Sequence, residues 1–240
     1  MEDIQKKNED TKKRLIEAAG ELFARRGFRS ATVREICSLA GAHVGAVNYH
    51  FRDKEGLYAA VLEHSHQLAM RRYPPDLGLG NGATPEEKLR AYIHSFLLRI
   101  LAEGFPAWHG KLMAREISDP TGALGQLVES SIRPLHLYLA GIIRELFQEA
   151  DSSNEEESDV TFLCAMSIVG QCLHYFKGKQ VIAALSPNGF DPFRIERLTD
   201  HITRFSLGGI RALRSAGIGG SAVNRRCFPE REGPPGGSKK

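Results

Sequence analysis

The chain has 240 residues, of which 42% are hydrophobic, 25% charged and 8% aromatic. This composition excludes a wholly disordered chain, a collagen-like repeat and a small disulfide-stapled scaffold, and the length suits one large domain or two modest ones. The formal net charge of +3 is too small to indicate a partner, but its basic excess lies in residues 1–55 and 215–240.

The four cysteines form no C-x-x-C pair and no metal-spaced cluster with histidine. With no signal peptide in the sequence, we expect reduced thiols in a cytoplasmic protein that holds no metal ion and no cofactor. The apolar run Val160–Phe176 is shorter than the ~20 residues that cross a bilayer, so we expect a buried core helix and no membrane partner. The cysteines are Cys37, Cys164, Cys172 and Cys227.

The N-terminal segment predicts one amphipathic helix. Residues 1–9 are polar and predict a frayed end, and either Asp10 or Thr11 is suited to cap the helix start. Gly27 is suited to end the helix, because glycine readily adopts the left-handed backbone conformation found at helix C-termini. Apolar residues recur at i, i+3, i+4, i+7 and i+8, namely at Leu15, Ala18, Ala19, Leu22 and Phe23.

Two short helices follow this segment. Thr32 and Glu35 have the spacing of a capping box that begins the first of them, and Gly41 ends it. The second lies between Gly41 and Asp53. Two short helices joined by a glycine-containing turn are typical of a helix-turn-helix, here residues 32–51, whose second helix fits the major groove of DNA.

The side chains of that second helix suit DNA. Gly45 lets the backbone approach closely, and Asn48 has the amide geometry for a bidentate contact with adenine. Tyr49 and His50 are able to bond phosphates, as are Lys54 and Thr32 at helix starts. Alternatively, His50 packs within the domain, Lys54 is a solvated charge and Tyr49 is half-buried.

The rest of the chain predicts helices only. Asp53 is suited to cap a fourth helix that runs towards Met70, and prolines and glycines break the chain at residues 74–82. Pro134 is expected to kink or divide its helix. Asp151–Asp159 is expected to form an acidic surface loop. The apolar run Val160–Leu185 predicts a helix that is buried on most sides. The later helices are predicted from Thr84 to about Gly104, Trp108 to Ile117, Leu124 to Phe147, Val160 to Leu185 and Ile195 to Leu213.

The run Thr32–Phe51, followed by Arg52–Leu57, closely resembles the DNA-binding segment of TetR-family regulators, and Leu15–Gly27 resembles their first helix. The resemblance implies an all-α homodimer. It implies a three-helix helix-turn-helix domain over residues 10–55, then a larger helical effector-binding and dimerisation domain over residues 56–214. A disordered tail is expected over residues 215–240. It also implies a repressor that a small-molecule effector releases from palindromic double-stranded operator DNA.

Carried onto this sequence, the resemblance implies that Val44, Gly45 and Asn48 read base edges. Two positions depart from the usual family pattern. His43 stands where a small hydroxyl residue is usual, and Asn48 stands where an aromatic residue is usual, so the departures concern the operator sequence and not the fold. The implied phosphate contacts are Thr32, Tyr49, His50 and Lys54.

Candidates for an effector pocket are polar or aromatic residues in the predicted later helices. For each of them core packing is the alternative, and Arg115 and Glu116 are also suited to pair with each other or with another helix. No phosphate loop, G-x-S-x-G or zinc signature indicates an enzyme, so the alternative function is a ligand-binding or scaffolding protein without operator specificity. The candidates are Trp108, Met113, Arg115, Tyr138, Phe162, Met166 and His174.

Overall fold

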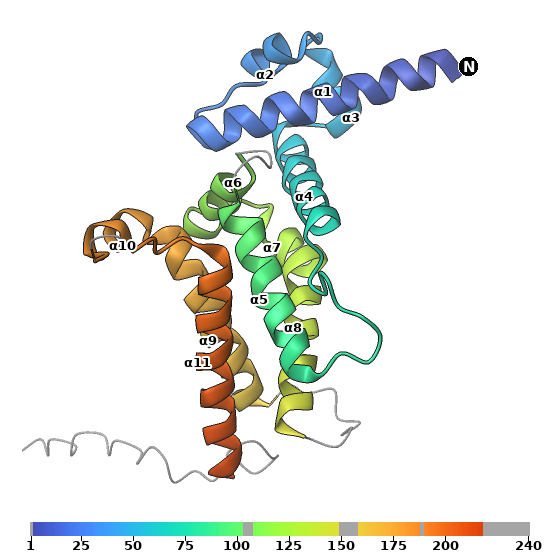
Figure 1. The fold of residues 1–240 in the computed structure, drawn as a ribbon. Helices are drawn as coiled ribbons and strands as arrows, with labels where there is room; N and C mark the ends of the chain where they lie inside the picture. The colour runs from blue at the N-terminus through green and yellow to red at the C-terminus, as the bar shows by residue number, and fades with distance from the viewer. Residues whose placement is uncertain (1, 103–107, 149–157, 188–189, 218–240) are drawn as a thin grey trace, which may run out of the picture.

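The computed structural model describes residues 2–102, 108–148, 158–187 and 190–217, and side chains from residue 5 onwards. Within these ranges the chain forms helices joined by turns and no strand, which confirms the all-α prediction. Figure 1 shows a small group of helices, α1 to α3, above a longer bundle, with α4 descending from one to the other. The helices are α1 Glu2–Arg26, α2 Val33–Ala40, α3 Gly45–Phe51, α4 Lys54–Arg72, α5 Pro85–Leu101, α6 Trp108–Ser118, α7 Leu124–Leu127, the π-helix η1 Val128–Ile132, α8 Arg133–Phe147, α9 Asp159–Lys177, α10 Lys179–Leu185 and α11 Ile195–Ser215.

The local signals for helix ends are confirmed. Thr32 and Glu35 form a complete capping box, and so do Thr84 and Glu87 at the start of α5. Gly41 has a φ of +58°, the left-handed conformation that lets α2 turn sharply into α3.

The predicted start of the first helix was wrong, because α1 begins at Glu2 and not near residue 10. The charged first turns are supported by contacts at i+4 spacing. The Thr11 hydroxyl donates to the Lys7 carbonyl at 2.9 Å, and Arg14 pairs with Asp10 at 3.1 Å. The Asn8 amide also donates to the Tyr49 hydroxyl of α3 at 3.2 Å, which ties this end of α1 to the next helices.

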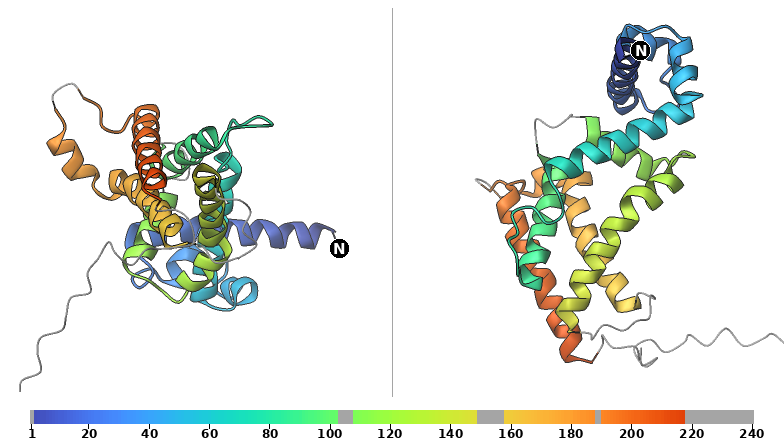
Figure 2. Two further views of the ribbon diagram at one scale, coloured as in Figure 1. Left: turned by 90° about the horizontal axis from the view of Figure 1, so that it is seen from below. Right: turned by 90° about the vertical axis from the view of Figure 1, so that its right-hand side faces the viewer.

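The buried apolar residues form two clusters. The first joins α1, α2 and α3 to the upper half of α4, and it includes Leu112 of α6 and Leu127 of α7. The second is formed by α5, α8, α9 and α11. Helices α4, α6 and α7 therefore connect the three N-terminal helices to the bundle, and Figure 2 shows this connection from the side. The domain boundary between residues 55 and 56 stays a prediction.

Pro134 divides the helix that was predicted over residues 124–147. The backbone passes through the five-residue π-helix η1 before α8 begins at Arg133. A proline ring lacks an N–H donor and clashes with the carbonyl of the preceding turn, and the wider π-helical turn makes room for it.

The prediction of a single helix over residues 160–185, buried on most sides, was wrong. The helix breaks at Gly178, and much of its apolar surface is open: Leu163 is 61% exposed and Leu185 is 78% exposed. The sequence shows that these residues are apolar, but the other described residues of a single chain do not bury them.

No described helix is both long and apolar enough to cross a bilayer. The predicted acidic loop, the 186–189 turn and the predicted tail lie wholly or partly outside the described residues.

Candidate DNA-reading helix and its link to the bundle

Helix α3 presents a polar, small-residue face to solvent. Val47 and Phe51 hold it against the first hydrophobic cluster. On the opposite side Tyr49 is 73% exposed, and Gly45 and Asn48 are exposed as well. The face holds the hydrogen-bonding groups of Asn48 and Tyr49, and Gly45 has no side chain that would keep the backbone from a DNA groove.

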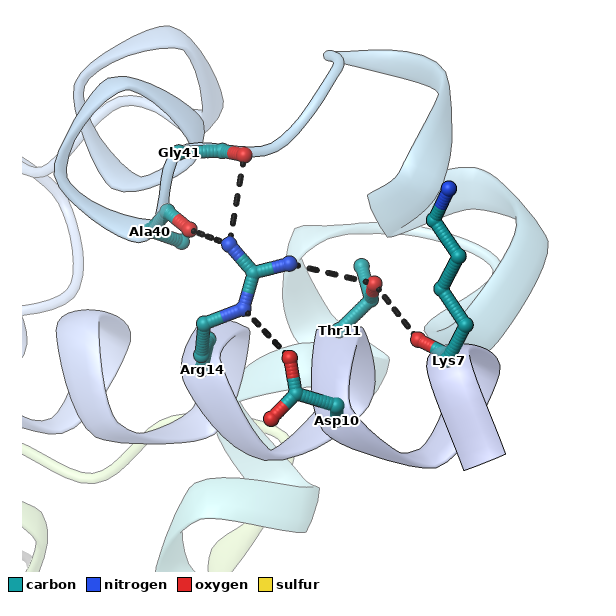
Figure 3. Close-up of polar contacts among 6 residues, drawn as sticks. All are labelled: Lys7, Asp10, Thr11, Arg14, Ala40 and Gly41. Carbon is teal, nitrogen blue, oxygen red and sulfur yellow. Dashed lines mark hydrogen bonds and ion pairs between the residues drawn. The ribbon is translucent and has the colours of Figure 1, made fainter. Parts of the chain in front are cut away.

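Arg14 holds the turn between α2 and α3, which sets the orientation of α3. Its Nη1 donates to the carbonyl oxygens of Ala40 at 2.7 Å and Gly41 at 3.3 Å, at the end of α2 (Figure 3). The guanidinium is itself held on α1 by Asp10 and by the Thr11 hydroxyl. These bonds satisfy carbonyls that a helix end leaves unpaired, so α1 sets where the turn begins. Sequence reasoning missed Arg14, whose i+4 spacing from Asp10 was its only signal.

His43 lies just before the start of α3. Its Nδ1 accepts a hydrogen bond of 3.2 Å from the Gly45 amide, while the N-cap residue Val44 makes no side-chain cap. The imidazole thus pairs a backbone amide at the start of α3, as the side chain of an N-cap residue commonly does. Both His43 and Val44 are exposed, Val44 by 48%.

Two of the predicted phosphate contacts are engaged within the chain. The Thr32 hydroxyl is part of the capping box with Glu35, whose pKa is lowered by the hydrogen bonds from Thr32 and from Arg26. Lys54 lies 4.6 Å from the centre of the Phe28 ring, and its Nζ is 3.4 Å from the Arg29 carbonyl oxygen.

The other two lie side by side near the start of α1. The rings of Tyr49 and His50 meet edge to face, with centres 4.9 Å apart. Burial and the nearby Lys12 ammonium lower the pKa of His50, so the imidazole is neutral at neutral pH. A neutral imidazole retains one N–H donor for a phosphate oxygen.

Helix α6 docks against α1. A Cβ on Gly20 of α1 would stand 2.8 Å from the Trp108 ring, so glycine is what permits the approach. Arg115 donates from Nε to the Ala24 carbonyl at 3.2 Å and from Nη2 to the Arg25 carbonyl at 3.3 Å. The last carbonyls of α1 are therefore capped by a side chain of α6.

Glu116 joins α6 to α4. Its carboxylate has no exposed surface and accepts hydrogen bonds from the Tyr58 hydroxyl at 2.9 Å and from the Thr121 amide at 3.0 Å. Burial and this carboxylate raise the pKa of Tyr58. Arg115 and Glu116 do not pair with each other, and each makes an inter-helix contact of its own.

The structure does not gather the seven pocket candidates around one cavity of the described ranges. Trp108 and Met113 pack against the first hydrophobic cluster, and Arg115 caps α1. Tyr138 stacks on Tyr92, with ring centres 6.3 Å apart. The remaining three are exposed, namely Phe162 by 46%, Met166 by 39%, and His174 beside a shallow hollow between α9 and α10.

Comparison with known proteins agrees with this architecture. Residues 15–61 match the model of bacterial regulatory proteins of the tetR family, and residues 85–210 match the C-terminal domain of the HTH-type transcriptional dual regulator CecR. CecR of Shigella flexneri is 28% identical over 207 residues, which covers 82% of this chain and 90% of CecR.

Two solved structures share the fold. A putative transcriptional regulator from Pseudomonas aeruginosa PAO1 has a TM-score of 0.59 at 22% identity and covers 85% of this chain and 92% of its own. AibR, solved with isovaleryl coenzyme A and operator DNA, has a TM-score of 0.57 at 18% identity and covers 81% of this chain and 97% of its own.

Proposed function

We infer the function of this chain from the premise that it belongs to the TetR family of transcriptional regulators, since two family models match its N-terminal helices and its bundle. We propose that it is a homodimeric repressor that a small-molecule effector releases from a palindromic operator. The observation that carries the proposal is the exposed polar face of α3, held by α1 and joined through α4 and α6 to the bundle.

In this proposal α3 enters the major groove. Val44, Gly45 and Asn48 meet base edges, and His43 lies against the groove at the helix start. The phosphate contacts come from Thr32, Tyr49, His50 and Lys54. Lys54 exchanges its contact with the Arg29 carbonyl for a phosphate oxygen, and DNA binding therefore loosens the loop between α1 and α2.

The dimer is proposed to form through α9 and α11. These helices contact each other and carry exposed apolar side chains, including Leu163 on α9 and Phe205, which is 66% exposed, on α11. Gly208 and Gly209 leave open space on α11 that lets a second copy approach. A two-fold axis would set the two α3 helices about one DNA turn apart, ~34–36 Å.

Release by effector requires two states with different spacing of the two α3 helices. An effector shifts the population only by its difference in affinity for the two states. Helices α4 and α6 are the elements that transmit the change, because both contact α1 while they are also part of the bundle's upper end. AibR, which was solved with both an acyl thioester and operator DNA, supports an effector for the present chain.

Selection of duplexes from a random-sequence library by the purified full-length chain tests this proposal. A regulator of this kind enriches a palindrome. A ligand-binding or scaffolding protein without operator specificity enriches no sequence and shows only salt-sensitive binding to bulk DNA.

A further inference from the structure

A buried arginine lies at the upper end of the bundle. Arg99, in the last turns of α5, is 8% exposed. Its Nη1 donates to the Tyr73 carbonyl oxygen at 2.7 Å and to the Ser95 hydroxyl. Its Nη2 is fully buried and makes no hydrogen bond in the described part of the chain, and no described carboxylate forms an ion pair with this guanidinium.

The described titratable groups that interact with Arg99 are neutral at neutral pH. His66 of α4 and His109 of α6 have pKa values lowered to about 4 by burial and by the positive charge of Arg99. Burial raises the pKa of Cys172 of α9 and of Tyr92 of α5 to about 12. Each of these side chains therefore carries no charge at neutral pH.

Arg99 itself keeps its charge. Burial lowers its pKa only to about 10, and a guanidinium remains protonated far above neutral pH. Among the described residues, the interior between α4, α5, α6 and α9 thus holds the positive charge of Arg99, whose Nη2 donor has no hydrogen-bond partner there. Such an arrangement costs stability unless an anion completes it, because Nη2 loses its hydration without a replacement hydrogen bond and the buried charge has no described counter-ion.

We propose that Arg99 recognises the effector, and that the effector is a small organic acid whose carboxylate binds Nη2 while its apolar part packs in the bundle interior. This inference rests on the function proposed above. A single uncompensated charge matches a monoanion, whereas a phosphate dianion would need a second cation. The Phe96 ring, with its centre 5.5 Å from the guanidinium carbon, supplies an apolar wall beside the charge.

The position of Arg99 also suits regulation. The side chains around Arg99 include His109 of α6. The Nδ1 atom of His109 is hydrogen-bonded to the Ser65 hydroxyl of α4. An acid that reaches Nη2 must displace some of the side chains that bury Arg99. Helix α6 would then move relative to α4, and it is α6 that holds the end of α1 through Arg115.

Matched acids and amides test the inference. The purified full-length protein is unfolded by heat with hexanoic, decanoic, benzoic or phenylacetic acid, and with the primary amide of each at the same concentration. We expect at least one acid to raise the unfolding midpoint by about 5–10 °C when it is well above its dissociation constant, and its amide to raise it far less. The same acid should release the protein from its operator.

Variants assign the effect to Arg99. R99M should abolish the difference between the acid and its amide, and R99K should weaken acid binding while keeping the charge. The control is R90M, because Arg90 lies on the same helix but is exposed and pairs with Asp200 at 2.8 Å. If R99M does not fold, the comparison of R99K with R90M decides the assignment.

Two results would overturn the inference: equal shifts from acid and amide in every pair, or an acid shift that R99M and R99K leave unchanged. Operator binding by the ligand-free protein is measured in the same samples. A protein that binds its operator but does not distinguish acid from amide refutes the acid site and leaves the proposed function standing. An acid bound through Arg99 by a protein without DNA preference refutes the proposed function instead.

Discussion

The Tyr58 hydroxyl of α4 donates a 2.9 Å hydrogen bond to Oε2 of Glu116, a fully buried carboxylate of α6. The Tyr58 ring also packs edge to face on Phe23 of α1, with ring centres 5.0 Å apart. Tyr58 therefore contacts both the core of the three N-terminal helices and α6, the helix that packs the bundle against them.

Replacing Tyr58 with phenylalanine removes this donor and leaves Glu116 buried with fewer hydrogen bonds. We expect Y58F to lower the free energy of unfolding by about 1–3 kcal/mol in urea titrations. Because the bond joins α4 to α6, the variant should also need a different effector concentration for release from DNA. Y49F is the control for stability, since Tyr49 is exposed and its loss of a hydroxyl should cost less than about 0.5 kcal/mol. Equal stability of the two variants would contradict the role of Tyr58.

Gly56 allows α4 to begin directly after α3. A Cβ at this position would stand 2.1 Å from the Phe51 carbonyl oxygen, a backbone atom that a side-chain rotation does not move. We expect G56A to destabilise the protein by about 3 kcal/mol and to weaken DNA binding. The matched control is G125A, where the added methyl group would meet no atom within 4 Å beyond its chain neighbours and the adjacent backbone of its own helix. Thermal unfolding of the two variants checks the prediction, and a stable G56A protein would refute it.

The proposed dimer interface predicts the effect of a charge on α11. F205E places a carboxylate where we propose an apolar contact between two copies, so we expect a monomer with an unchanged helical circular dichroism spectrum and no palindrome binding. L39E is the control, because Leu39 is similarly exposed, by 62%, but lies on α2. Sedimentation velocity measures the outcome. If both F205E and L163E remain dimers, the copies associate through another surface.

The buried histidines predict acid sensitivity. The pKa values of His66 and His109 are about 4 in the folded chain, below the value of about 6.5 expected when unfolded. The unfolded chain therefore binds protons first as the pH falls, and stability should decrease between about pH 6.5 and pH 4. Urea midpoints across this range measure the slope. H109Q should flatten it, whereas H201Q, at an exposed position, should not; equal slopes in both variants would contradict the assignment.

The sequence predicted features that depend on neighbouring residues along the chain. The capping box of Thr32 and Glu35 and the left-handed Gly41 are examples, because their geometry is set within a few residues. Packing partners were harder to predict. Trp108 and Met113 were pocket candidates but face the first hydrophobic cluster, since periodicity shows which face is apolar and not what covers it. Arg99 was missed for the same reason, because its burial depends on helices far away in sequence.

We propose that α3 reads a palindromic operator. The most direct measurement is parallel selection of random duplexes, at near-physiological salt, by the full-length protein and by N48A. We predict that the unaltered protein enriches a palindrome with half-sites about one helical turn apart. N48A should enrich the same palindrome but lose about 1–3 kcal/mol of discrimination at one base pair in each half-site. No enrichment by the unaltered protein, or identical base preferences in N48A, would contradict the account.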